Sequence, residues 1–138
     1  FIVTLIYVLK VRWLNDQQLI NQFIYDVRIF CGPIEIKGSG FVDTGNHLID
    51  EKTALPIMMV PKEMFCKESM EDFLMKHRIS SWSTSYSVIN DDQQHLLVFK
   101  PTLLLINDQV VRNVLIGVVE NQFYEYDFLL QPSMVRSI

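Results

Sequence analysis

The chain has 138 residues, of which 49% are apolar and 20% are charged, and its formal net charge is −4. This composition excludes a disordered chain and predicts a single globular domain with a modest core. The sequence contains no lysine- and arginine-rich run that could bind the phosphate groups of a nucleic acid. No nucleic-acid partner is therefore expected.

The first nine residues are almost entirely apolar, and Lys10 and Arg12 follow at once. One interpretation of residues 1–13 is the end of a truncated transmembrane helix with its basic flank in the cytoplasm, because nine residues cannot span a bilayer that needs about 20. The alternative is a buried β-strand, since many of these residues are β-branched. Residues 14–22 are mostly polar and predict a linker or a weak helix.

Short runs of strand-forming residues dominate the rest of the chain, residues 23–138. The predicted strands are residues 23–31, 34–37, 56–60, 96–99, 103–106, 110–111, 114–119 and 126–130. Gly38 and Gly40 predict a break or bulge just before the second strand leads into Phe41. Residues 62–77 have apolar side chains roughly at helical spacing and predict one amphipathic helix. Many short strands and one principal helix indicate a mainly β fold.

The two cysteines, Cys31 and Cys66, are not arranged as a metal or redox motif. They form no Cys-x-x-Cys pair and have no histidine at metal-ligand spacing. Two free thiols are therefore expected, and the sequence predicts no metal site and no cofactor.

The candidate catalytic residue is Asp43, which follows an apolar strand end and begins the motif Asp43-Thr44-Gly45. An aspartic protease holds two carboxylates about 3 Å apart around one water, so that they share a proton and one acts as general base. Thr44 supplies a small hydroxyl that can hydrogen-bond across the pair, and Gly45 lets the backbone approach the second carboxylate. The motif on its own is a weak signal, because tight turns use the same residue types.

Two further features add weight to the motif. It occurs once, in a chain too short for two lobes, so the second carboxylate is expected from a second chain. Leu115, Ile116 and Gly117 match the apolar-apolar-glycine element of retroviral-type proteases, which packs behind the catalytic loop.

Other side chains have less specific interpretations. Asp50 in the following loop could bind substrate, but a solvated loop carboxylate is the favoured interpretation. Asp91 and Asp92 predict a turn and not a second catalytic pair, because no glycine follows them. Trp82 and Tyr86 fit either a substrate cleft or packing in the core or a dimer.

The sequence around the motif resembles the sporulation sigma-E factor processing peptidases of bacteria, which are membrane-anchored aspartic peptidases. The core of the resemblance is residues 38–46, where Asn46 after the Asp-Thr-Gly motif separates this family from ordinary retropepsins. The further segments that carry the resemblance are residues 24–27, 48–50, 55–60, 99–101 and 131–134. One departure lies in residues 78–88, where the flap or its approach is expected but no glycine is present to give a mobile tip.

The resemblance has several implications. It implies a bundle of transmembrane helices followed by a cytoplasmic protease domain at the cell membrane, which favours the helix interpretation of the first nine residues. The expected fold is a retropepsin-like closed β-barrel or sandwich half that forms a two-fold homodimer, with one Asp43 from each chain. The expected substrate is the sigma-E factor precursor, cleaved near its N-terminus, and the expected activator is a signal protein made in the forespore.

Two other hypotheses stay open from the sequence. One is a non-catalytic retropepsin-like module for dimerisation or binding, and it predicts a dimer without turnover. The other is an unrelated membrane-associated β-domain with a chance Asp-Thr-Gly, in which the Asp43 carboxylates of two chains have no reason to meet.

Overall fold

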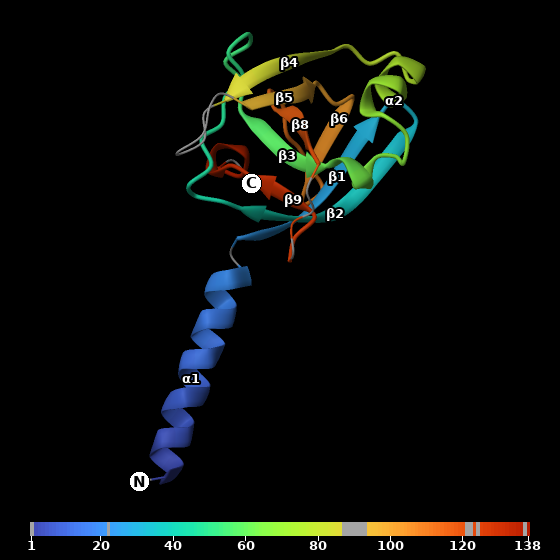
Figure 1. Cartoon of the computed structure of the whole chain (residues 1–138). Coiled ribbons are helices and arrows are strands. Elements are labelled where there is room, and N and C mark those ends of the chain that lie inside the picture. Colours follow the sequence, from blue (N-terminus) through green and yellow to red (C-terminus); the bar gives the residue numbers. More distant parts are fainter. Residues whose placement is uncertain (1, 22, 87–93, 121–122, 124, 137) are drawn as a thin grey trace.

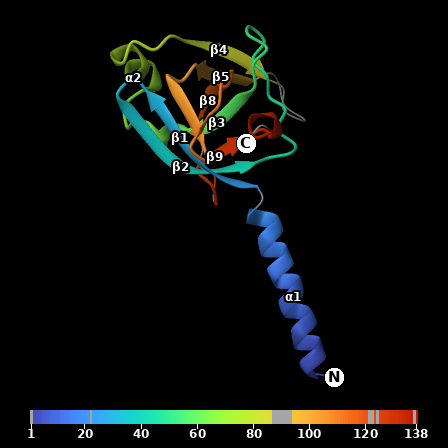
Figure 2. The same ribbon diagram turned by 180° about the vertical axis from the view of Figure 1, so that it is seen from behind.

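The computed structural model describes residues 2–21, 23–86, 94–120, 123, 125–136 and 138. A long N-terminal helix, α1 (Ile2–Asn21), stands away from a body that is built mostly of strands (Figures 1 and 2). The body also contains a short helix, α2 (Met70–Lys76), and two single turns of 3-10 helix, η1 (Lys62–Met64) and η2 (Pro132–Met134). The predicted mainly β class is confirmed.

The strands of the body form one mixed sheet. They are β1 (Ile24–Cys31), β2 (Ile34–Val42), β3 (Ile57–Pro61), β4 (Ser81–Tyr86), β5 (Gln94–Phe99), β6 (Leu103–Ile106), β7 (Gln109–Val110), β8 (Leu115–Val119) and β9 (Phe128–Leu130). Their hydrogen-bonded order is β4-β5-β8-β3-β9-β2-β1-β6-β7, so β4 and β7 are the edges of an open sheet among the described residues. Every predicted strand is present, and β4 is the strand that the sequence did not predict.

β2 runs without interruption through its glycines, so the predicted break or bulge is wrong. Its residues pair one to one with β1, including Gly38 with Val27 and Gly40 with Tyr25. The glycines allow close packing instead. A Cβ on Gly38 would lie 2.7 Å from Cβ of Asp127, and a Cβ on Gly40 would lie 2.9 Å from Cγ2 of Val27. The glycine at position 38 therefore leaves room for a neighbouring strand to approach β2.

The prediction of one helix over residues 62–77 is wrong, because η1 and α2 are separate elements. α2 begins after Ser69, which has an extended backbone (φ −68°, ψ 144°) and whose side chain accepts a hydrogen bond from the Asp72 N–H at 3.1 Å. This cap satisfies an amide that the first turn of a helix leaves free, so a new helical run begins there. The apolar side chains of α2 still face the core.

The apolar N-terminal segment is helical, so the β-strand alternative for it is wrong. α1 continues through the polar stretch that was expected to be a linker or a weak helix. The apolar side chains of its first half, residues 2–11, are exposed, and Val3 is 80% exposed. None of the helices among the described residues combines the length and apolar character that crossing a bilayer would take.

The core of the body has a larger cluster that includes Phe99 and Phe128 and a smaller one that includes Leu115. Fully burying a large apolar side chain stabilises a fold by about 1.5–3 kcal/mol. Cys31 is buried in the larger cluster, Cys66 is half-buried, and both are free thiols, as predicted. Burial raises the pKa of the Cys31 thiol to about 12, so this side chain acts as a small apolar residue.

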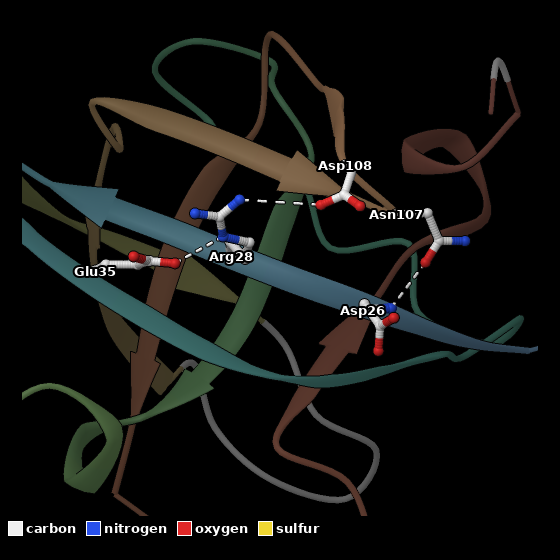
Figure 3. A network of polar contacts seen from close by, with 5 residues as sticks. All are labelled: Asp26, Arg28, Glu35, Asn107 and Asp108. Carbon is white, nitrogen blue, oxygen red and sulfur yellow. Dashed lines mark hydrogen bonds and ion pairs between the residues drawn. The ribbon is translucent and has the colours of Figure 1, made fainter.

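A polar network fixes β1 against its neighbours (Figure 3). Arg28 on β1 forms an ion pair with Glu35 on β2 at 2.6 Å and reaches Asp108 at 3.9 Å. The side chain of Asn107 accepts a hydrogen bond from the Asp26 N–H at 2.9 Å, and the Asn107 N–H donates to the Asp26 carbonyl at 2.8 Å. Asn107 and Asp108 both have positive φ, which suits the tight turn between β6 and β7. The network sets the register of this hairpin on β1.

Candidate active site

Asp43 lies directly after β2, where the strand ends in a tight loop. Its N–H donates to the carbonyl of Leu130 on β9 at 3.1 Å, and its carbonyl accepts from the Asn46 N–H at 3.0 Å. Its carboxylate oxygen Oδ1 accepts a hydrogen bond from the Gly45 N–H at 3.0 Å. The half-buried Asp43 side chain is therefore held in place by the backbone of its own loop.

The strand that organises this loop is β9. It lies between β2 and β3, pairs in parallel with β2, and is antiparallel to β3 (Figure 1). β2 and β3 are consecutive in the chain, so a strand from near the C-terminus is inserted between the two strands that flank the loop of Asp43. Asp127, the residue before β9, accepts a hydrogen bond from the Ser39 N–H at 2.9 Å and so helps to fix β9 on β2.

Leu115, Ile116 and Gly117 lie elsewhere, in β8. This strand pairs with β3 and β5, and the sheet order places β3 and β9 between it and β2. Gly117 serves packing, because a Cβ there would lie 2.6 Å from Cγ2 of Ile57. The segment next to the loop of Asp43 is β9, whose apolar run is followed by Gln131 and not by glycine, so the sequence pattern pointed to the wrong strand.

Gln131 supports the loop, and the sequence analysis named it only as part of a resembling segment. Its side chain is buried, and its amide nitrogen donates to the carbonyls of Leu48 and Ile57 at 2.5 and 3.0 Å. The Ile57 N–H also donates to the Leu48 carbonyl at 3.2 Å. One buried amide thus fixes the end of β9 to Leu48 and Ile57, which lie at the two ends of the segment that follows the loop of Asp43.

Two features of the loop have no explanation within one chain. Gly45 is exposed, lacks a left-handed φ, and a Cβ there would meet only Oδ1 of Asp43, at an ordinary 3.5 Å. The side chain of Asn46 accepts a hydrogen bond from the Leu48 N–H at 3.2 Å, but its amide nitrogen is buried without a hydrogen-bond partner among the described residues. A buried donor without an acceptor costs free energy. Thr44, the third supporting residue, is exposed beside them.

Asp50 is fully buried, so the prediction of a solvated loop carboxylate is wrong. Its Oδ2 accepts hydrogen bonds from the N–H and Oγ1 of Thr53 at 3.0 and 2.7 Å. Nε1 of Trp82 donates to both carboxylate oxygens, at 3.2 and 3.3 Å. Burial raises the pKa of Asp50, but hydrogen bonds from Thr53, Trp82 and Thr84 outweigh it and leave the pKa below its usual value of 3.8.

Replacing Asp50 by asparagine is expected to lower the free energy of unfolding by about 2–3 kcal/mol at neutral pH, because buried donors lose their charged acceptor. Since the pKa is lowered in the folded state, this stabilisation is complete above the unfolded pKa and is lost as the pH falls below it. Urea unfolding at pH 7 and pH 3 measures the difference, which should shrink at pH 3. Glu51→Gln, at an exposed neighbouring carboxylate, is the control. An Asp50→Asn difference that is the same at both pH values contradicts the expectation.

A cleft of about 510 Å³ opens beside the loop of Asp43. Residues 45–49 and Glu51 line one part of it, and Ser85 and Tyr86 of β4 line another. A larger cavity, of about 700 Å³, is lined by other parts of the body and by none of residues 43–49. Of these two cavities, only the smaller is lined by residues of the loop that follows Asp43, and Asp43 itself is not among its lining residues.

The remaining candidate residues divide between packing and the cleft. Trp82 and Tyr86 pack against the smaller core cluster, and Tyr86 also lines the cleft. Of residues 78–88, where the flap or its approach was expected, Ser81–Tyr86 form β4, and residues 87 and 88 lie outside the described residues. Asp91 and Asp92 lie outside the described residues.

Comparison with known proteins connects this geometry to one family. The model of a peptidase family, U4, described as sporulation factor SpoIIGA, matches residues 1–134. A protein of Clostridium acetobutylicum named probable sporulation sigma-E factor-processing peptidase is 27% identical over 136 residues, which are 94% of this chain and 49% of that protein. The chain thus spans about half the length of this curated relative. No solved structure matches the chain. The family model covers nearly all of the chain, including the loop of Asp43, and the chain belongs to the sporulation factor SpoIIGA family of peptidases.

Proposed function

We propose that this chain is the protease part of an aspartic endopeptidase that works as a homodimer. The observation that carries the proposal is the loop of Asp43, in which hydrogen bonds from the backbone fix one carboxylate at the end of a strand. No second carboxylate of the described residues is hydrogen-bonded to it. Aspartic protease chemistry needs two carboxylates that share one proton, so Asp43 of a second copy supplies the other.

In the proposed dimer, a water molecule lies between the two Asp43 carboxylates. One carboxylate takes a proton from the water as general base, and the other donates its proton to the carbonyl oxygen of the scissile peptide. The Thr44 hydroxyl groups hydrogen-bond across the pair. A second copy also accounts for the glycine at position 45, which one chain does not require, and it supplies an acceptor for the buried Asn46 amide. Both points support the dimer.

The proposed fold of each copy is a retropepsin-like half. Its support is the insertion of β9 between β2 and β3, which braces the loop of Asp43 from behind. The strong curvature of the sheet in Figures 1 and 2 suits a half-barrel that closes around a substrate with its partner.

The proposed substrate is the precursor of the sigma-E factor, cleaved near its N-terminus. The support is the family and the name of the Clostridium acetobutylicum relative, a sporulation sigma-E factor-processing peptidase. A signal protein from the forespore is the proposed activator. The proposed location is the cell membrane, with the protease part in the cytoplasm, and the exposed apolar side chains of α1 followed by Lys10 and Arg12 support it.

Co-expression with the sigma-E precursor tests this function. The wild-type chain is expected to shorten the precursor, and Asp43→Ala is expected to leave it intact while remaining folded by circular dichroism. Light scattering should give the mass of a dimer. A dimer that never cleaves the precursor favours the alternative, a non-catalytic retropepsin-like binding module, whereas normal cleavage by Asp43→Ala would falsify the protease proposal.

A further inference from the structure

β4 is an edge strand and is hydrogen-bonded to the sheet along one side, by β5. It pairs with β5 along its whole length, from Ser81 opposite Phe99 to Tyr86 opposite Gln94, and the sheet order gives it no other strand neighbour. Edge strands with one partner are the parts of a sheet most easily displaced. What else holds β4 therefore determines where it lies relative to the loop of Asp43.

The turn that begins at Asp50 holds β4 through three consecutive contacts. Nε1 of Trp82 donates to the two oxygens of the Asp50 carboxylate. The Glu51 N–H donates to Oγ1 of Thr84 at 3.4 Å, and Oγ of Ser85 donates to Oε1 of Glu51 at 3.1 Å. A further hydrogen bond reaches the Asp50 carboxylate from Thr84. The contacts of Asp50 with β4 are the ones with a buried charged acceptor, and charge-assisted hydrogen bonds are the stronger kind.

The anchor itself is rigid. Asp50 is held by the two hydrogen bonds from Thr53, its N–H donates to the Leu55 carbonyl at 3.0 Å, and its carbonyl accepts from the Ala54 N–H at 2.8 Å. No cation of the described residues forms an ion pair with the Asp50 carboxylate. A buried charge without a counter-ion is a costly way to stabilise a turn, since apolar packing does so at least as well. A carboxylate at this place is better explained by the geometry that it imposes on Trp82.

The same stretch of chain links this anchor to the catalytic loop. Residues 45–49 and Glu51 line the cleft beside Asp43, and Ser85 and Tyr86 of β4 also belong to its lining. Gln131 fixes the chain on both sides of the turn at Leu48 and Ile57. Because these two points are fixed, the contact between Asp50 and Trp82 links β4 to a segment whose ends are held in place.

We infer that Asp50 is a positioning residue for peptide cleavage: through Trp82 it holds β4 as the wall of the cleft in which an extended peptide substrate binds beside Asp43. The inference rests on the proposed function. It assigns to Asp50 an effect on substrate binding, since Asp50 is buried and does not touch the reacting groups.

The first test is the steady-state cleavage of purified sigma-E precursor by the Trp82→Phe variant of the chain. This change removes the indole N–H and keeps an aromatic ring against the core, so folding is retained where Asp50→Asn destabilises. The expected result is an increase of roughly tenfold in KM with kcat within about twofold, because the wall is misplaced while Asp43 is not. Lys52→Ala is the matched control. Lys52 lies over the same ring, at 5.3 Å from its centroid, and its removal should leave KM unchanged.

The second test is amide hydrogen exchange, which does not depend on activity. In Trp82→Phe, the amides of residues 50–55 and of β4 should exchange faster than in the wild type, with those of β1 unchanged. Faster exchange with an unchanged KM overturns the inference, because the contact is then only structural. Unchanged exchange in β4 overturns it as well. If the wild-type chain shows no Asp43-dependent cleavage, the proposed function fails and this inference fails with it, whereas normal cleavage with an unaffected KM in Trp82→Phe removes the inference alone.

Discussion

Co-expression of wild-type and Asp43→Asn chains is expected to lower precursor cleavage with the square of the wild-type fraction. Asparagine keeps the shape of the side chain but cannot act as a general base or share a proton, so a dimer with even one variant chain loses the reaction. Pure Asp43→Asn should be at least about 1000-fold slower than the wild type, since general acid–base catalysis contributes about that factor. The measurement is the initial rate of precursor cleavage at a constant total amount of chain.

The way in which the cleavage rate depends on the wild-type fraction distinguishes an active site shared by two chains from one that is complete in each chain. If each chain carried its own active site, cleavage would fall in direct proportion to the wild-type fraction. Asp72→Asn is a suitable control, because Asp72 lies on α2 and its N–H, not its carboxylate, makes the capping contact with Ser69. Mixtures with this variant should keep the wild-type rate. A linear dependence in the Asp43→Asn mixtures contradicts the homodimeric site even if Asp43 is essential.

The loop of Asp43 could be predicted from the sequence as a tight turn after a strand, because its signal is local. Asp43, Thr44 and Gly45 are adjacent, and the hydrogen bond from the Gly45 N–H to Asp43 spans two residues. Most strands were predictable for the same reason, since each is a continuous run of strand-forming residues. β4 was not, because its serine- and threonine-rich sequence becomes a strand only through pairing with β5.

The segments that support the loop of Asp43 could not be predicted from sequence patterns, because they lie far from it in the sequence. β9 pairs with β2 in parallel, at Gly40–Phe128, and no local motif encodes which strand becomes the neighbour of another. The burial of Asp50 depends on an indole donor 32 positions further on, at Trp82. A loop rich in turn residues predicts exposure, and only the three-dimensional structure reveals that its carboxylate accepts hydrogen bonds from Trp82, on a strand that also lines the cleft.

Gly45→Ala and Gly38→Ala are expected to separate assembly of the active site from folding of the chain. In one chain a Cβ on Gly45 has room, with its nearest contact at 3.5 Å, so the free energy of unfolding should stay within about 0.5 kcal/mol of the wild type. In the proposed dimer, the methyl group would meet the second copy where the two loops of Asp43 face each other. Cleavage should therefore fall by about 100-fold, with a weaker dimer in light scattering.

Gly38→Ala should behave in the opposite way. A Cβ at position 38 would lie 2.7 Å from Cβ of Asp127, which cannot move without shifting β9, so the loss of stability should be about 1–3 kcal/mol. Urea unfolding and light scattering on both variants measure the two effects side by side. An active and dimeric Gly45→Ala variant would show that the loops of Asp43 do not meet in a dimer. A strongly destabilised variant would show that glycine is required within the single chain.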